Sequence, residues 1–216
     1  MSSTFRFLPL VFALLFLGVP TASTSPQDEA AASEEGQDAA TEVAEDEDTD
    51  PLSRVVRMSE PGEYHEHLED HVGTWDLTVR IWQEVEGEPV ESAATAEAQM
   101  ILGGRFLETV YRGEILGTSF EALSIEGYDN QARQFVRSWW DNTGTGTFIF
   151  RGQCEEECRV RTLTADFSDS TTSQRLRNKG VTTFELDDED SYTYESFIVM
   201  PDGSEFKNME FVARRR

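Results

Sequence analysis

Lysine and histidine are scarce in this sequence of 216 residues. Lys179 and Lys207 are the only lysines, and 18 basic residues face 42 acidic ones, so the formal net charge is −24 at pH 7. A protein that binds nucleic acid or an anionic membrane needs a positive surface. The charge balance therefore excludes nucleic acid and anionic lipid as expected partners.

Long apolar runs are also absent, apart from one near the start. Residues 1–25 contain Arg6, an apolar run from Leu8 to Gly18, and then small residues. This pattern is typical of a signal peptide. The run is shorter than the roughly 20 residues that span a bilayer, although a retained anchor is the alternative. We therefore expect an exported protein, periplasmic or secreted, with no membrane contact after cleavage.

Basic and aromatic residues are missing from the next segment. Residues 26–50 contain eleven acids among small and polar residues. Such a composition buries too little apolar surface to offset the entropy lost on ordering. We expect an acidic disordered linker over residues 26–57, ahead of a single domain at 58–216. A dedicated partner-binding tail is the alternative.

Cysteine occurs twice, as Cys154 and Cys158, with three glutamates between them. In an exported protein an even pair favours a disulfide, here at the tip of a hairpin. A redox pair or half of a metal site are the alternatives. The glutamates argue against a redox pair, because their charges raise the pKa of a neighbouring thiol.

Helical periodicity is confined to one stretch, which begins near residues 59–62 and ends at Gly73. Beyond it, apolar and polar residues alternate with the period of a β-strand, and turn residues recur at short intervals. The predicted strands are 74–83, 90–100, 105–112, 120–128, 134–141, 147–153, 159–167, 175–186, 192–200 and 205–213. We expect an all-β fold: an antiparallel up-and-down barrel of about ten strands with a short N-terminal helix.

Several strands place aromatic and charged residues on one face, as in Arg137, Trp139 and Asp141. A ligand-holding barrel interior tolerates such mixtures, whereas the alternative is that these polar faces lie outside. The candidate ligand-binding residues have three roles. Tyr111 and Trp139 offer stacking surface, and Arg105, Arg137 and Lys179 pair with a ligand carboxylate. Asp141 and Glu195 complete the set; the alternative is that these two acids neutralise the bases internally and leave no net site.

The three histidines, His65, His67 and His71, lie in the predicted helix. His67 and His71 share a helical face with Glu63, a set that can hold zinc. Their order differs from the metalloprotease pattern, and we expect no metal.

Several motifs carry a family resemblance. They are Gly73-Thr-Trp75 at the start of the first strand, Met100-Ile-Leu-Gly-Gly-Arg-Phe106, Gly127-Tyr-Asp129 and Pro201-Asp-Gly-Ser-Glu-Phe206. The sequence resembles the bacterial DUF1579 family over about residues 63–214. The Gly-x-Trp start is also similar to that of lipocalins and fatty-acid-binding proteins, which implies a calyx around a small ligand. In that resemblance Gly73 and Trp75 are structural, with Trp75 as a plug at the barrel base.

A cofactor is not expected. Nitrobindin-like barrels of similar shape hold haem through a histidine near the C-terminus, and this chain has none after His71. The predicted function is non-covalent binding of a small, partly apolar molecule in the barrel. An enzyme that uses a buried carboxylate as acid or base is an alternative, although the sequence favours a non-enzyme. A partner-binding module without a ligand is the other. Neither catalytic residues nor oligomeric state follow from the sequence.

Overall fold

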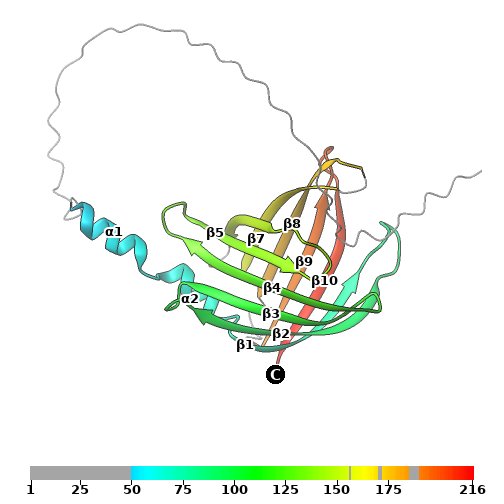
Figure 1. Cartoon of the computed structure of the whole chain (residues 1–216), viewed down its shortest axis with the longest axis horizontal. Coiled ribbons are helices and arrows are strands. Elements are labelled where there is room, and N and C mark those ends of the chain that lie inside the picture. The colour runs from blue at the N-terminus through cyan, green and yellow to red at the C-terminus, as the bar shows by residue number, and fades with distance from the viewer. Residues whose placement is uncertain (1–49, 156, 170–171, 185–189) are drawn as a thin grey trace, which may run out of the picture.

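A closed barrel makes up most of the molecule (Figure 1). The computed structural model describes residues 50–216 except 156, 170–171 and 185–189. Its ten strands follow the order β1-β10-β9-β8-β7-β6-β5-β4-β3-β2 around the barrel. Each strand pairs antiparallel with its neighbours in sequence, and β1 (Gly73–Ile81) closes the ring against β10 (Glu205–Arg215). The predicted fold class is confirmed. The expected signal peptide and residues 26–49 lie outside the described residues.

The remaining strands follow the predicted ones, with ends that differ by up to three residues. They are β2 (Val90–Ile101), β3 (Phe106–Ile115), β4 (Thr118–Asp129), β5 (Gln134–Asp141), β6 (Phe148–Glu155), β7 (Val160–Ser168), β8 (Arg175–Phe184) and β9 (Ser191–Val199). Successive side chains point to opposite faces of a strand. In β8, for example, Leu176 and Asn178 are buried inside, while Arg175 and Arg177 are exposed outside.

Helix α2 (Glu63–Glu69) covers one end of the barrel. It contacts β2, β3 and β4, and its Leu68 is completely buried against Leu107 and Phe135. Gly62 donates its backbone N–H to Nδ1 of His65, which holds the start of the helix. The predicted position of the helix across a barrel end is therefore observed, and its buried face is part of the core.

Helix α1 (Pro51–Ser59) lies outside the barrel and has no buried residue (Figure 1). The expectation of a disordered linker up to residue 57 is wrong for residues 51–57. Asp50 explains the difference, because its carboxylate accepts hydrogen bonds from the backbone N–H groups of Leu52 and Ser53. Such a cap, followed by proline at the first helical position, starts a helix directly after the acidic segment.

Two apolar clusters lie inside the barrel. The first lies toward α2 and includes Leu68, Leu107, Phe135, Phe150 and Leu163. The second surrounds Trp75 and includes Leu77, Tyr192, Tyr194, Phe211 and Ala213. Within the described residues, neither helix reaches the length and apolar character that crossing a membrane requires.

Candidate functional site

The interior face of β5 carries Phe135, Arg137, Trp139 and Asp141. Phe135 is fully buried, and the side chain of Arg137 is 12% exposed. Trp139 is half-buried and packs against the first apolar cluster. The predicted inward orientation of Arg137 and Trp139 is therefore observed. The mixed face lies inside, although it places a charge in the core.

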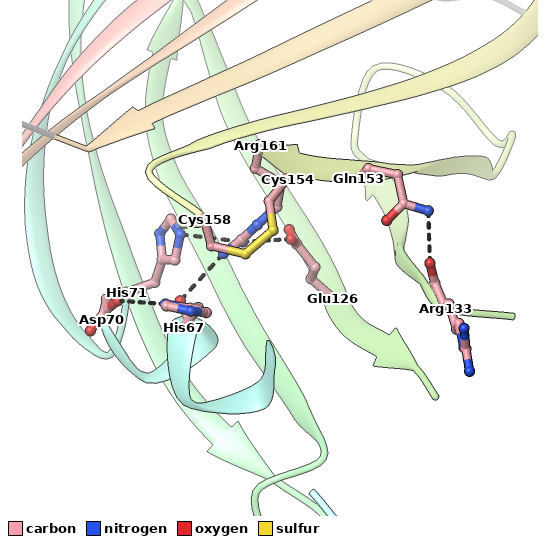
Figure 2. The surroundings of a disulfide bond; sticks show 9 residues. All are labelled: His67, Asp70, His71, Glu126, Arg133, Gln153, Cys154, Cys158 and Arg161. Carbon is pink, nitrogen blue, oxygen red and sulfur yellow. Dashed lines mark hydrogen bonds and ion pairs between the residues drawn. A yellow bond between two sulfur atoms is a disulfide. The ribbon is translucent and has the colours of Figure 1, made fainter. Parts of the chain in front are cut away.

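Glu126 of β4 forms an ion pair with the guanidinium group of Arg137. Nε of Arg137 donates to Oε2 of Glu126 at 2.6 Å, and Nη1 of Arg161 donates to Oε1 at 2.7 Å. Glu126 is 4% exposed, and the side chain of Arg161 is not exposed at all. One carboxylate thus holds two guanidinium groups inside the barrel. We call Glu126, Arg137 and Arg161 the interior charge cluster (Figure 2 shows Glu126 and Arg161).

Arg161 also connects the cluster to the chain around α2 (Figure 2). Its Nη2 donates to the backbone oxygen of His67 at 3.3 Å, and its Nη1 lies 3.5 Å from Nε2 of His71. Because a guanidinium group only donates, Nε2 of His71 faces it without a proton. The guanidinium carbon of Arg161 lies 4.3 Å from the centre of the Phe135 ring. The covered end of the barrel is therefore linked to the charge cluster.

Charge and burial set the protonation states of this group. Burial alone raises the pKa of Glu126, but the charges of Arg137 and Arg161 outweigh burial and lower that pKa to about 2. Burial lowers the pKa of Arg161, and Glu126 acts in the opposite direction. The pKa of Arg137 is raised, because the charge of Glu126 outweighs burial. Both guanidinium groups remain protonated at neutral pH, as arginine does in proteins.

His71 is buried, and burial together with the charge of Arg161 lowers its pKa well below the usual value. Its ring makes edge contacts with Phe184 and Tyr192, with centroids 4.5 and 4.9 Å apart. His71 is therefore neutral at pH 7. His71 adds no positive charge to the barrel interior, and as a neutral ring it does not compensate the positive charge of Arg161.

Tyrosine and tryptophan rings line the interior next to Arg137. Tyr111 of β3 lies 5.1 Å from Trp139 between ring centroids, and both are half-buried. The guanidinium carbon of Arg137 lies 5.6 Å from the centre of the Tyr194 ring. Tyr194 stacks on Phe211 at 4.9 Å. A Cβ at Gly180 would lie 2.6 Å from the Tyr194 hydroxyl, so a glycine at this position leaves room for the ring.

The tyrosines stay neutral. Burial raises the pKa of Tyr111, Tyr192 and Tyr194, and the charge of Arg137 only partly opposes it. Asp141 takes part in the turn after β5: it accepts hydrogen bonds from Nε1 of Trp139 at 2.8 Å and from the backbone N–H of Thr143 at 2.9 Å. One interpretation of the sequence was that Asp141 neutralises Arg137. In the structure Asp141 instead fixes the indole ring of Trp139.

Three of the predicted ligand residues lie elsewhere. Nε of Arg105 donates to the backbone oxygen of Ser59 at 3.0 Å, and so ties the end of α1 to the turn between β2 and β3. Lys179 and Glu195 lie on the outer face, where Lys179 pairs with Glu205 and Glu195 pairs with Lys207. Their interior placement was wrong, because β8 and β9 turn the opposite residues inward.

Gly73 and Trp75 close the end of the barrel that α2 covers. Trp75 is 1% exposed, and its Nε1 donates to the backbone oxygen of His71 at 2.8 Å. The guanidinium carbon of Arg215 lies 4.2 Å from the centre of its ring. Gly73 has a φ of 138°, and a Cβ there would lie 2.7 Å from Nη1 of Arg215. Trp75 is therefore buried where the chain passes from α2 into β1.

Cys154 and Cys158 form a disulfide at the tip of the β6–β7 hairpin, with Cα atoms 4.7 Å apart (Figure 2). The prediction of a disulfide is confirmed. Cys158 is buried in the same cluster as Leu68 of α2. The disulfide therefore joins the hairpin tip to this buried cluster, next to β7, the strand that carries Arg161.

Metal-binding geometry is absent among the described residues, which bring no three His, Cys, Asp or Glu side chains together. His65 is buried, whereas His67 points toward Asp70, with 3.9 Å between Nδ1 and Oδ2. A cleft of about 570 Å³ lies outside the barrel, beside Arg57, Tyr64 and Tyr128. It includes none of the predicted ligand residues.

Glu126 and Arg161 were missed by reasoning from the sequence. Each shares one face of its strand with buried residues: Glu126 with Ala122 and Ser124, and Arg161 with Leu163 and Ala165. The available signal was a charged residue two positions from small or apolar residues, because residues with that spacing lie on the same face of a strand.

The sequence and the fold were compared with those of known proteins. Residues 60–215 match the family described as "Protein of unknown function (DUF1579)". The chain belongs to the DUF1579 family. Among solved structures, the DUF1579 chain is similar to Rv2717c from M. tuberculosis, with a TM-score of 0.51 and 13% sequence identity. The match covers 73% of this chain and 99% of the other, and it shows a shared fold alone. No curated protein matches this sequence.

Proposed function

We propose that this DUF1579 protein binds a small, partly apolar molecule non-covalently inside its barrel. The observation that carries the proposal is the contact between Tyr111 and Trp139 on the interior face, where both rings keep part of their surface uncovered. Aromatic surface beside a few fixed polar groups is the usual lining of a small-molecule site. Arg137 supplies such a polar group, held in place by Glu126.

The alternative of acid–base catalysis receives less support. A general acid or base works best when its pKa lies near the working pH. Glu126, the buried carboxylate of the interior, has a pKa of about 2 because two arginines bind it. It remains an anion at any ordinary pH. Its role is to hold Arg137 and Arg161 rather than to transfer protons.

The alternative of a partner module based on the N-terminal helix also receives less support. Leu68 of α2 is buried in the barrel core, so the apolar face of that helix is already occupied. Helix α1 exposes Leu52 and Val55, but nothing in the molecule indicates what would cover them. The interior is the better-defined site.

Export is the second part of the proposal. Disulfides persist in oxidising compartments, and the Cys154–Cys158 bridge fits such a location. The apolar run of residues 8–18 supplies the expected export signal. We therefore place ligand binding in the periplasm or outside the cell.

Native mass spectrometry of the protein purified from its own source tests the proposal directly, because a retained ligand adds a discrete mass. In solution, an apolar ligand that binds beside Trp139 changes its fluorescence. Trp139→Phe is the control, since Trp75, Trp82 and Trp140 also emit. A fluorescence change that survives Trp139→Phe, with no added mass in the native protein, would contradict interior binding.

A further inference from the structure

The interior charge cluster carries one more positive than negative charge. The interior charge cluster contains the guanidinium groups of Arg137 and Arg161 and the single carboxylate of Glu126. Within the part of the chain that the structure describes, Nε of Arg161 is buried without a hydrogen-bond acceptor. A buried charge that lacks a partner is costly. The cluster itself has one positive charge without a directly paired carboxylate.

Within the described residues, Glu126 is the carboxylate that forms ion pairs with Arg137 and Arg161. Tyr111, Tyr192 and Tyr194 stay protonated in this surrounding, and His71 is neutral. Nδ2 of Asn178 donates to Oγ of Ser196 at 3.1 Å, so these two neutral side chains satisfy each other. Asp141 keeps its charge, but it is hydrogen-bonded to Trp139 and Thr143 in the turn after β5. Asp70 acts on Arg161 only from the exposed side of α2. The excess positive charge of the cluster is therefore open to direct pairing with a ligand.

Arg137 is the member of the cluster that a ligand can reach. Its side chain is 12% exposed, compared with 0% for Arg161. Tyr194 lies beside it and is hydrogen-bonded to it. On its other side, Trp139 follows two residues later on the same face of β5, in contact with Tyr111. A charged group and an apolar surface thus adjoin each other at one place.

We propose that the ligand is a small organic anion with a single negative charge, a carboxylate, which pairs with Arg137 and the Tyr194 hydroxyl while its apolar part lies on Tyr111 and Trp139. This inference rests on the proposed function and specifies its ligand class. A carboxylate accepts charge-assisted hydrogen bonds from a guanidinium group, and a single charge matches the excess of one.

Three probes that differ only in the head group test the proposal with the full chain: dodecanoate, dodecanamide and dodecylammonium. Binding is measured by calorimetry and by Trp139 fluorescence. Dodecanoate should bind at least about tenfold more tightly than the amide, as a hydrogen bond to a charged group predicts. Dodecylammonium should bind most weakly. Equal binding of acid and amide would refute the anion preference and leave interior binding intact. No binding of any probe would contradict the proposed function itself.

Arg137→Gln should abolish the preference, so that dodecanoate and dodecanamide bind alike. The variant leaves Glu126 paired with Arg161 one to one, and we therefore expect it to fold. Lys179→Gln is the matched control, because it removes a positive charge from the outer face and should leave the preference unchanged. A preference that persists in Arg137→Gln would overturn the assignment of the head-group site.

Tyr194→Phe keeps the test valid if Arg137→Gln does not fold. It removes one hydroxyl beside Arg137 and keeps the ring that stacks on Phe211. Affinity for dodecanoate should fall roughly threefold to tenfold, as expected for the loss of one hydrogen bond, while the affinity for dodecanamide changes less. An equal loss for both probes would contradict a role of Tyr194 at the anionic group.

Discussion

Ion pairs on the two faces of the same barrel differ in their surroundings. Inside, Glu126 binds Arg137 and Arg161, with side-chain exposures of 12% or less. Outside, Lys179 of β8 binds Glu205 of β10 across the intervening strand β9, with exposures of 25% and 39%. Water screens the outer pair, so that it contributes little to stability. The inner charges have lost their water and depend on one another. Similar chemistry therefore carries different energetic consequences on the two faces.

The largest expected effect comes from removing the shared carboxylate. Glu126→Gln leaves two guanidinium groups in the interior without a counter-charge, and should lower the free energy of unfolding by about 3–5 kcal/mol. Urea denaturation of the full chain measures the loss. Glu195→Gln, which breaks the outer pair with Lys207, is the matched control and should cost less than about 1 kcal/mol. Similar losses in the two variants would show that the interior pairs are no different from the outer ones.

Lowering the pH should also destabilise the fold through the interior charge cluster. The pKa of Glu126 is about 2 in the folded protein, against an ordinary value of 4.5. A lowered carboxyl pKa stabilises the fold above the unfolded-state pKa, and this contribution is lost as the pH falls from about 4.5 to about 2. The shift corresponds to about 3 kcal/mol. Stability measured by denaturation at several pH values should fall across that window. In Glu126→Gln the same titration should show a smaller fall.

A weaker effect should appear at milder pH through His71. Its folded-state pKa is lowered by burial and by Arg161, so the unfolded protein binds the additional proton. Stability should therefore fall as the pH drops below about 6.5, by at most about 1.4 kcal/mol per pH unit for this one group. His65 acts in the same direction, because burial lowers its pKa too. His71→Asn should reduce the slope between pH 7 and 5; an unchanged slope would mean that His71 is not the group that titrates.

The smallest effect is expected on the outer face. Lys179→Gln breaks the pair with Glu205 and should change the free energy of unfolding by no more than about 1 kcal/mol. Because salt screens exposed charges, even that difference should shrink in 1 M NaCl. The loss in Glu126→Gln should persist at the same salt concentration. A salt-dependent loss in both variants would remove the distinction between the two faces.

The sequence by itself determined the barrel and several of its details. Period-two alternation separated by turn residues located all ten strands, and the range of β5 was predicted to the residue. The even cysteine pair indicated the disulfide, and the Gly73-Thr-Trp75 pattern indicated where the first strand begins. These features are local. Each follows from the neighbours of a residue along the chain, and tertiary contacts were not needed to recognise them.

Only the tertiary structure decided which face of a strand is the inside. In β4 the sequence alternates Leu123 and Ile125 with Ser124 and Glu126, and hydrophobicity alone places the two aliphatic residues in the core. The closed barrel does the opposite: Glu126 is buried, and Leu123 and Ile125 are only half-buried. Lys179 and Glu195 were expected inside as partners of a ligand or of each other's charges, and closure of the barrel turns both residues to the outer face.

The physical reason is that the partners of Glu126 come from other strands. Arg137 lies opposite it in the register of β4 and β5, and Arg161 approaches it across the interior from β7. A carboxylate is buried at acceptable cost only when such partners are present. Alternation along one strand tells which side chains share a face. Closure of the barrel and the register between strands determine which charges meet inside it.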